Sequence, residues 1–151
     1  MLNEHVFRTG IEWSRRRAGW LKTAGLPPLE VSAPPEFNGD AGVWTPEHLL
    51  VGATASCLMT TFLAIADLWG LAVLRFQMEA EGKIEKVPGE GHRFTQITLR
   101  PEVEVGPEDE EKVRKVLAKA EQNCFVKNSL RAAVRVEPRI LVAAAEAARV
   151  A

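Results

Sequence analysis

Two cysteines, Cys57 and Cys124, are the residues of this chain best suited to chemistry. The chain has no others, and these two are 67 positions apart (124 − 57), so only the tertiary fold could bring them together. A thiolate can act as a nucleophile, and a second thiol can then convert the oxidised product to a disulfide. If folding pairs the two thiols, the chain carries the elements of redox chemistry.

Each cysteine could also be a structural residue without a chemical role. A lone cysteine on an apolar helix, as Cys57 would be, is most often a small buried hydrophobic residue. Cys124 could be a core residue that ends a helix, although its polar neighbours Asn123 and Lys127 suit an accessible thiol. Which interpretation holds depends on what surrounds the two sulfur atoms.

A reactive thiolate needs a positive group nearby, and the tightest basic group in the sequence is Arg15, Arg16 and Arg17. These arginines could instead form a solvated turn with their charges in water. Glu47 lies ten positions before Cys57 (57 − 47) and is open to two interpretations. It could simply stabilise a helix N-terminus, or its carboxylate could hold one arginine in a two-bond pair and direct it at the thiol.

Metal and phosphate chemistry have little support. The three histidines, His5, His48 and His92, are scattered, and neither cysteine has a second ligand at the spacing of a zinc site. There is no glycine-rich loop of the phosphate-binding type and no histidine placed to form a thiol dyad. We therefore expect no metal and no cofactor.

The composition indicates one soluble domain over residues 1–151, with 46% hydrophobic and 26% charged residues. The net charge of −1 gives no reason to expect nucleic acid or an anionic membrane as a partner. The start of the chain does not read as a signal peptide, and the apolar run over residues 49–74 is interrupted by Asp67 and Gly70. We expect that run to be a buried helix followed by a strand, in a cytoplasmic protein.

Apolar periodicity predicts the elements. Alternation over residues 7–17 predicts a half-buried strand with Arg15 and Arg17 on its inner side, and short strands follow near residues 20–21 and 29–31. Thr45 and Pro46 are typical of a helix start, and we expect that helix to continue to about Leu68. It is apolar almost all round, which indicates burial on every side and favours a partner subunit.

The second half of the chain predicts a long hairpin and a helix. Strands are expected over residues 71–84 and 97–105, with a turn between them at residues 88–91. An amphipathic helix should begin at Pro107 and end near Cys124. A last strand over residues 134–142, bent at Pro138, and a weakly helical tail over 143–151 complete the pattern.

Two segments resemble the OsmC/Ohr family, the osmotically inducible and organic hydroperoxide resistance proteins. The first is Thr45-Pro46-Glu47-His48-Leu49-Leu50, leading through Ala53 and Ala55 to Cys57. The second is Ala120-Glu121-Gln122-Asn123-Cys124, followed by Asn128-Ser129-Leu130. The resemblance extends over nearly the full length, but Phe125 stands where many members have proline, and residues 27–35 form a Pro-rich insert.

The resemblance implies an α+β fold in which antiparallel sheets wrap a pair of central apolar helices in an intertwined homodimer, with the active sites at the dimer interface. It also implies roles for single residues. Cys57 would be the peroxidatic cysteine and Cys124 the resolving one, while Glu47 would hold the catalytic arginine. The Arg-x-Gly turn of the family matches Arg17-Ala18-Gly19, so Arg17 is the expected arginine, with Arg15 and Arg16 as alternatives.

The implied activity is that of an antioxidant peroxidase of the oxidative stress response. It would reduce organic hydroperoxides through a Cys57 sulfenic acid and a disulfide with Cys124. A lipoyl protein, a small dithiol or a thioredoxin-type system would then reduce the disulfide. Apolar neighbours, among them Leu58, Phe62 and Phe125, would favour a hydrophobic peroxide. Two alternatives stay open: a non-catalytic dimer that binds a small apolar ligand, and a thiol-based sensor of oxidants.

Overall fold

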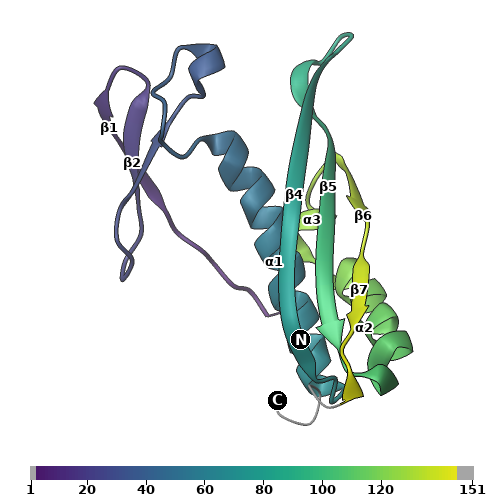
Figure 1. The fold of residues 1–151 in the computed structure, drawn as a ribbon. Coiled ribbons are helices and arrows are strands. Elements are labelled where there is room, and N and C mark those ends of the chain that lie inside the picture. The colour runs from purple at the N-terminus through teal and green to yellow at the C-terminus, as the bar shows by residue number, and fades with distance from the viewer. Residues whose placement is uncertain (1–2, 146–151) are drawn as a thin grey trace. The chain divides into compact units, whose positions relative to one another are not determined.

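The structure is a computed structural model that describes residues 3–145 (Figure 1). The chain divides into two compact units, Met1–Leu50 and Val51–Ala151, and each is described by itself. The fold is mixed α+β, as the sequence predicts, while the single domain over residues 1–151 and the homodimer stay predictions. Most of the expected C-terminal helix, residues 146–151, lies outside the described residues.

The first unit holds a three-stranded antiparallel sheet in the order β1-β2-β3. Its strands are β1 (Gly10–Arg15), β2 (Ala18–Lys22) and β3 (Leu29–Ser32), and a short 3-10 helix, η1 (Pro35–Phe37), follows them. The two short strands expected from the sequence are thus confirmed. The first strand ends earlier than expected, because the chain already turns at residues 16–17.

The predicted alternation fails at the end of β1. The pairing with β2 shifts register between Trp13 and Arg15, and Arg16 has a φ of 41°, in the left-handed region that non-glycine residues rarely adopt. All of β1 is exposed, and so are Arg16 and Arg17. The prediction that Arg15 and Arg17 face the interior is therefore wrong, since a period-two pattern cannot foresee a bulge.

Gly19, the glycine of the Arg-x-Gly turn, lies in β2 at this bulge. A Cβ atom at Gly19 would come within 2.6 Å of the carbonyl oxygen of Glu12 on β1. No real side chain tolerates that distance, so glycine lets the two strands approach where the register shifts.

The long predicted helix is confirmed as α1 (Pro46–Leu68). The hydroxyl of Thr45 accepts a hydrogen bond from the backbone N–H of His48 at 3.2 Å, which caps the helix. Gly70 ends it with a φ of 62°, and the N–H of Leu71 donates to the carbonyl oxygen of Ala66 at 2.9 Å. Both ends follow from capping residues visible in the sequence.

Only one stripe of α1 is buried: Thr54, Leu58, Phe62 and Ala66, spaced four residues apart. Other apolar positions are exposed, and Leu68 is 82% exposed. By length and composition alone α1 could cross a membrane, with a mean hydropathy of 1.9 over its most apolar window, but core helices of soluble proteins meet the same test. Its apolar surface thus extends well beyond the stripe that this chain covers.

The second unit is built on a long hairpin of β4 (Val73–Val87) and β5 (Gly91–Val105). Two short strands, β6 (Ala133–Val136) and β7 (Arg139–Val142), pair with β5 in parallel, one after the other along its length. The single last strand expected from the sequence is thus two strands separated at residues 137–138. The sheet is mixed and not purely antiparallel, which the local sequence pattern could not show.

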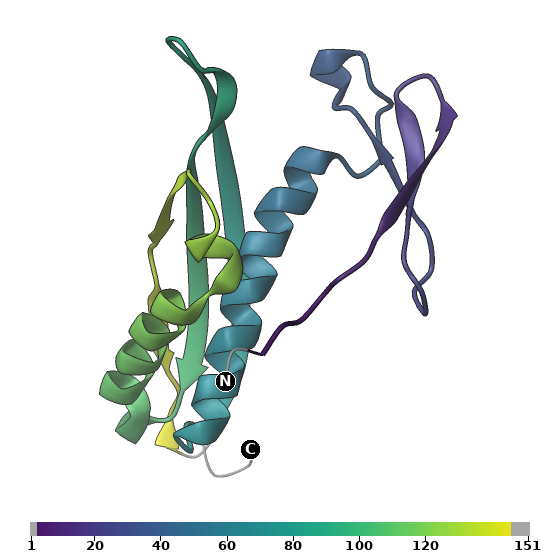
Figure 2. The ribbon, with the colours of Figure 1, turned by 180° about the vertical axis from the view of Figure 1, so that it is seen from behind.

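The helices of the second unit cover one face of this sheet (Figure 2). The amphipathic helix is confirmed as α2 (Glu110–Asn123), entered through a 3-10 turn, η2 (Pro107–Asp109), and followed by the short α3 (Phe125–Asn128). The core contains fully buried residues from α1, β5 and α2: Leu58, Phe62, Ile97, Leu99, Val103, Val105, Val113, Val116 and Ala120. This packing fixes α1 and α2 against the sheet.

Replacing Leu58 with alanine should lower the free energy of unfolding by about 2–5 kcal/mol, because Leu58 is fully buried and a cavity would remain. Urea unfolding followed by circular dichroism measures the change. Ser56→Ala, on the exposed side of α1, is the control and should change stability by less than about 0.5 kcal/mol. Equal effects of the two substitutions would contradict the burial described for this helix.

Candidate active site

The fold brings the two cysteines together, as the sequence hypothesis requires. Cys57 lies in the middle of α1. Cys124 is the single residue between α2 and α3, and its backbone is extended, with φ −72° and ψ 108°. The two thiols lie within hydrogen-bonding reach of each other. Cys57 is half-buried, whereas Cys124 has no exposed surface. Both thiols are free, so the structure shows the reduced pair.

The surroundings of Cys57 favour its thiolate. Burial alone would raise the pKa of this thiol, but hydrogen bonds from its neighbours outweigh that effect and hold the pKa below the ordinary value of a cysteine. The donors are the backbone of Val126, the thiol of Cys124, the hydroxyl of Thr61 and the backbone of Phe125. The two backbone donors lie in the first turn of α3, where amide groups favour negative charge.

The surroundings of Cys124 have the opposite effect. Burial raises the pKa of this thiol most, and the hydrogen bond and the charge of Cys57 raise it further, while the backbone of Lys127 and Val126 offsets part of the change. Cys57 is therefore the thiol that ionises first, and Cys124 stays protonated beside it. Such an arrangement supplies a nucleophile and a proton-bearing second thiol.

The expected arginines all belong to the first unit, whereas both cysteines belong to the second. Arg15 pairs with Glu30 and, at 3.0 Å, with Asp40, and Arg16 approaches Asp40 at 3.5 Å. Arg17 donates to the carbonyl oxygen of Phe37. Among residues 3–145 no carboxylate pairs with Arg17, so it is the arginine of the three whose charge is not already neutralised.

Glu47 lies in the first turn of α1 and is half-buried. Its Oε2 atom is buried and has no hydrogen-bond partner within the described part of the chain. A buried carboxylate oxygen without a donor is costly, so this position is suited to a cationic or N–H partner.

Two contributors to the site escaped the sequence analysis: Thr61 and the backbone at Phe125 and Val126. Thr61 could have been found, because it follows Cys57 by four residues and thus lies on the same face of α1. The backbone donors depend on where α2 ends and α3 begins, which residue types alone do not reveal. From the sequence we expected the side chain of an arginine to stabilise the Cys57 thiolate. Within the second unit, backbone amides of Phe125 and Val126 stabilise it.

A groove of about 520 Å³ adjoins the thiol pair within the second unit. Its lining comes from α1, α2 and the residues next to them: Thr60, Thr61, Ala64, Ile65, Leu68, Trp69, Lys119, Asn123 and Phe125. Phe125 is 81% exposed and borders the groove as the sequence suggested. Leu58 and Phe62, expected beside the substrate, are instead fully buried in the core.

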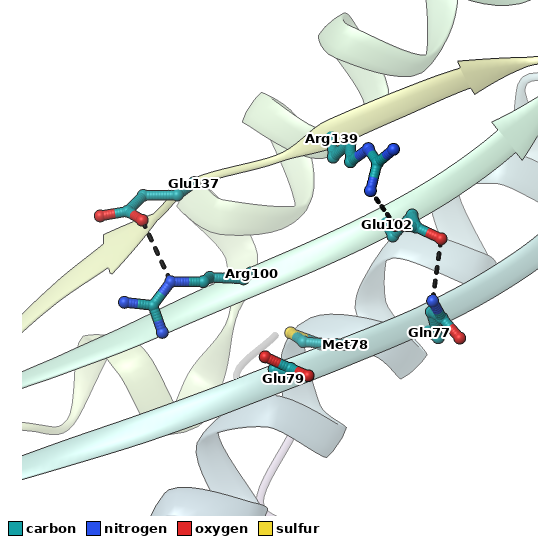
Figure 3. A pocket seen from close by; sticks show the side chains of 7 residues that line it. All are labelled: Gln77, Met78, Glu79, Arg100, Glu102, Glu137 and Arg139. Carbon is teal, nitrogen blue, oxygen red and sulfur yellow. Dashed lines mark hydrogen bonds and ion pairs between the residues drawn. The ribbon is translucent and has the colours of Figure 1, made fainter.

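A second hollow, of about 470 Å³, lies over strands β4 and β5 and the residues around β7 (Figure 3). Four of its five charged side chains are paired with one another, Arg100 with Glu137 at 3.3 Å and Arg139 with Glu102 at 3.2 Å, and the fifth is Glu79. These pairs connect Arg139 of β7 and Glu137, two residues before β7, to β5, and Met78 lies on the neighbouring strand β4 (Figure 3). It contains no nucleophile, so the thiol pair is the better candidate for chemistry.

No cluster of three or more His, Cys, Asp or Glu side chains suited to a metal ion occurs among residues 3–145. The thiol pair itself offers two sulfur atoms and the hydrogen-bond donors around Cys57.

Thr61→Val should raise the pKa of Cys57, because it removes one of the hydrogen bonds to the thiolate. Alkylation of the reduced protein by iodoacetamide, followed at Cys57 by mass spectrometry across a pH series, should become several-fold slower at neutral pH. Thr60→Val is the matched control, since the Thr60 hydroxyl bonds to backbone carbonyls and not to the sulfur. Identical pH profiles for the two variants would exclude Thr61 from the site.

The sequence and the fold can be compared with known proteins. The uncharacterized protein YmaD of Bacillus subtilis strain 168 is 26% identical over 140 residues, 89% of this chain and 92% of that protein. An OsmC-like protein of unknown function from Vibrio cholerae is 25% identical, with a TM-score of 0.80 over 91% of this chain and 99% of that one. An organic hydroperoxide resistance protein OsmC from Legionella pneumophila is 23% identical, with a TM-score of 0.72 over 92% of this chain and 100% of that one. A model of the family described as OsmC-like protein matches residues 39–139, and the chain belongs to that family.

Proposed function

We propose that this protein is a thiol peroxidase that reduces organic hydroperoxides. The observation that carries the proposal is the unequal pair of thiols: an accessible Cys57 with a lowered pKa, in contact with a buried Cys124 whose pKa is raised. A nucleophilic thiolate and a resolving thiol need this division. The apolar groove beside the pair suits an organic peroxide better than hydrogen peroxide.

The reaction follows from the two sulfur atoms. The Cys57 thiolate attacks one oxygen of the O–O bond, so that an S–O bond forms, the O–O bond breaks and the alkoxide takes a proton to leave as the alcohol. Cys124 then attacks the sulfenic sulfur, an S–S bond forms and water leaves. An external dithiol, supplied by a lipoyl protein, a small dithiol or a thioredoxin-type system, reduces the disulfide and is itself oxidised.

Arg17 and Glu47 complete the proposed site. Arg17 has no carboxylate partner among the described residues, and Glu47 has a buried oxygen without a donor, so each offers what the other lacks. A guanidinium held by a carboxylate in a two-bond pair would present a fixed positive charge to the peroxide and the thiolate. The backbone amides of α3 would then share the stabilisation of the thiolate with Arg17.

A homodimer is part of the proposal. The exposed apolar surface of α1 is continuous with its buried stripe, and Leu68 is 82% exposed. Apolar helix surface of this kind is normally covered by a partner. A second copy of the chain packed on α1 would cover it and would form a further wall of the groove that Leu68 lines, in line with a cytoplasmic antioxidant enzyme of the OsmC/Ohr type. One structural relative described as an organic hydroperoxide resistance protein supports the proposed activity through its fold.

Cys57→Ser should abolish consumption of cumene hydroperoxide in the presence of dithiols. Cys124→Ser should instead allow one equivalent of peroxide to react and then stop, because the sulfenic acid has no partner. A peroxide assay with single-turnover mass spectrometry distinguishes the two variants. Consumption that survives in Cys57→Ser would refute the proposal, while oxidation without turnover under every dithiol would favour a sensor. No reaction at all would favour a ligand-binding dimer.

Arg17→Lys replaces the guanidinium fork with a single ammonium group, and Glu47→Gln removes the carboxylate that would hold the fork. Each should lower kcat/KM for cumene hydroperoxide by roughly 10²-fold, the usual loss when a positioned donor is removed from a reacting centre. Steady-state kinetics with a saturating dithiol measure the loss. Arg16→Lys is the matched control, because Arg16 is exposed and already near Asp40, and it should retain nearly full activity. If Arg16→Lys is the damaging change and Arg17→Lys is not, the arginine has been wrongly assigned.

A further inference from the structure

We infer that Asn128 is a positioning residue of the thiol site, whose side chain fixes α3 to the end of α2 and so keeps the amides of α3 directed at the sulfur of Cys57. The inference rests on the proposed peroxidase function and extends it to a residue that acts through the backbone of its neighbours. It depends on the hydrogen bonds that pass from α3 to α2 beside Cys124.

The helix α3 is too short to hold its own orientation. It consists of four residues, Phe125–Asn128, and a single turn of helix is unstable in isolation. None of its residues is fully buried, and Phe125 is 81% exposed. The chain is anchored in the core just before α3, at Cys124, and again just after it, at Leu130. These two anchors fix where α3 lies but do not set its rotation about the line between them.

Asn128 supplies a link that opposes this rotation. Its side-chain amide donates a hydrogen bond at 3.0 Å to the carbonyl oxygen of Gln122, in the last turn of α2. Carbonyl groups in the last turn of a helix lack partners within that helix, so Gln122 is free to accept this bond. The backbone N–H of Asn128 donates to the carbonyl oxygen of Cys124, also at 3.0 Å. One residue thus closes the turn of α3 and joins that turn to α2.

The amides that this link holds are those that act on the nucleophile. The backbone of Phe125 and Val126 hydrogen-bonds the sulfur of Cys57, and Asn128 closes the same turn. Hydrogen bonds weaken steeply as donor and acceptor lose alignment. A small rotation of α3 would therefore take both donors away from the thiolate.

The other side-chain interactions near the junction are weaker or local. Lys127 and Glu121 also join α3 to α2, but their charged atoms are 3.8 Å apart and both side chains are partly exposed, so this ion pair contributes little. The hydroxyl of Ser129 donates to the carbonyl oxygen of Phe125 at 2.8 Å and does not reach α2. The orientation of α3 thus depends most on Asn128.

The test uses the reduced protein and needs no peroxide. Asn128→Ala removes the side-chain amide and keeps the backbone N–H. Alkylation of Cys57 by iodoacetamide should become about three- to tenfold slower at neutral pH, because a thiolate that loses hydrogen bonds is populated less. The rates of the two proteins should converge above about pH 10, where the thiol is ionised in both. Ser129→Ala and Glu121→Gln are the controls and should keep the wild-type pH profile. An unchanged profile in Asn128→Ala, or an equal change in either control, overturns the inference.

Hydrogen–deuterium exchange distinguishes positioning from a general loss of stability. The amides of residues 125–127 should exchange faster in Asn128→Ala, while those of α1 and β5 keep their wild-type rates. Faster exchange in all three elements would assign Asn128 to the stability of the whole fold and exclude it from the positioning role.

A peroxide assay separates this inference from the proposed function. If the wild type consumes cumene hydroperoxide, Asn128→Ala should slow the formation of the Cys57 sulfenic acid at neutral pH by about the same factor as it slows alkylation. Sulfenic acid formation at the wild-type rate would contradict the positioning role. If the wild type consumes no hydroperoxide, the proposed function fails, and the alkylation and exchange measurements still decide whether Asn128 positions α3.

Discussion

The contact between the middle of α1 and the junction of α2 with α3 is the interaction on which the candidate site depends. At that junction a single extended residue, Cys124, separates two helices, and the first turn of α3 directs amides at the sulfur of Cys57. Neither helix could hold this contact alone. It exists because both helices pack on the same face of the sheet, where Leu58 and Phe62 from α1 and Val116 and Ala120 from α2 belong to one buried core.

The two thiols differ because their surroundings differ, and not because of their nearest neighbours in sequence. Both lose water on folding, which opposes ionisation of either one. For Cys57, donors from two segments, α1 and residues 124–126, stabilise the thiolate by more than burial destabilises it, whereas Cys124 faces the developing charge of its partner. Backbone amides are well suited to this task, because they are fixed before any ligand arrives and cost no reorganisation.

The sequence predicts most of the frame and part of the site. Capping residues locate α1 and apolar periodicity locates β4, β5 and α2, since these patterns reflect local geometry and burial directly. The pairing of Cys57 with Cys124 was suggested by the resemblance to the OsmC/Ohr family, and the structure places the two thiols together. The division of the last strand into β6 and β7 was missed, because parallel pairing with a distant strand leaves no local trace.

The arginines show a second limit of prediction from the sequence pattern. A strand reading assigned Arg15 and Arg17 to the inner side of the sheet, but one bulge and one left-handed residue reverse that assignment. An inserted residue reverses which side of the strand every later residue faces. The residues after this bulge are the arginines, so the error affects the side chains that were expected at the site. The partners Glu30 and Asp40, which neutralise Arg15, lie 15 and 25 positions further along the chain (30 − 15 and 40 − 15), beyond the reach of a local pattern.

The geometry of α1 explains how one helix can serve the core, the chemistry and the groove at once. Positions 54, 58, 62 and 66 form its buried stripe, and Cys57, Thr61 and Ile65 form a second stripe displaced by one residue, each half-buried. A third stripe, at positions 56, 60 and 64, is exposed. Successive residues are rotated by about 100° around a helix, so the reactive stripe lies at the border of the core. At this border a thiol is shielded from water, which strengthens its hydrogen bonds, and it is still open enough for a small molecule to reach it.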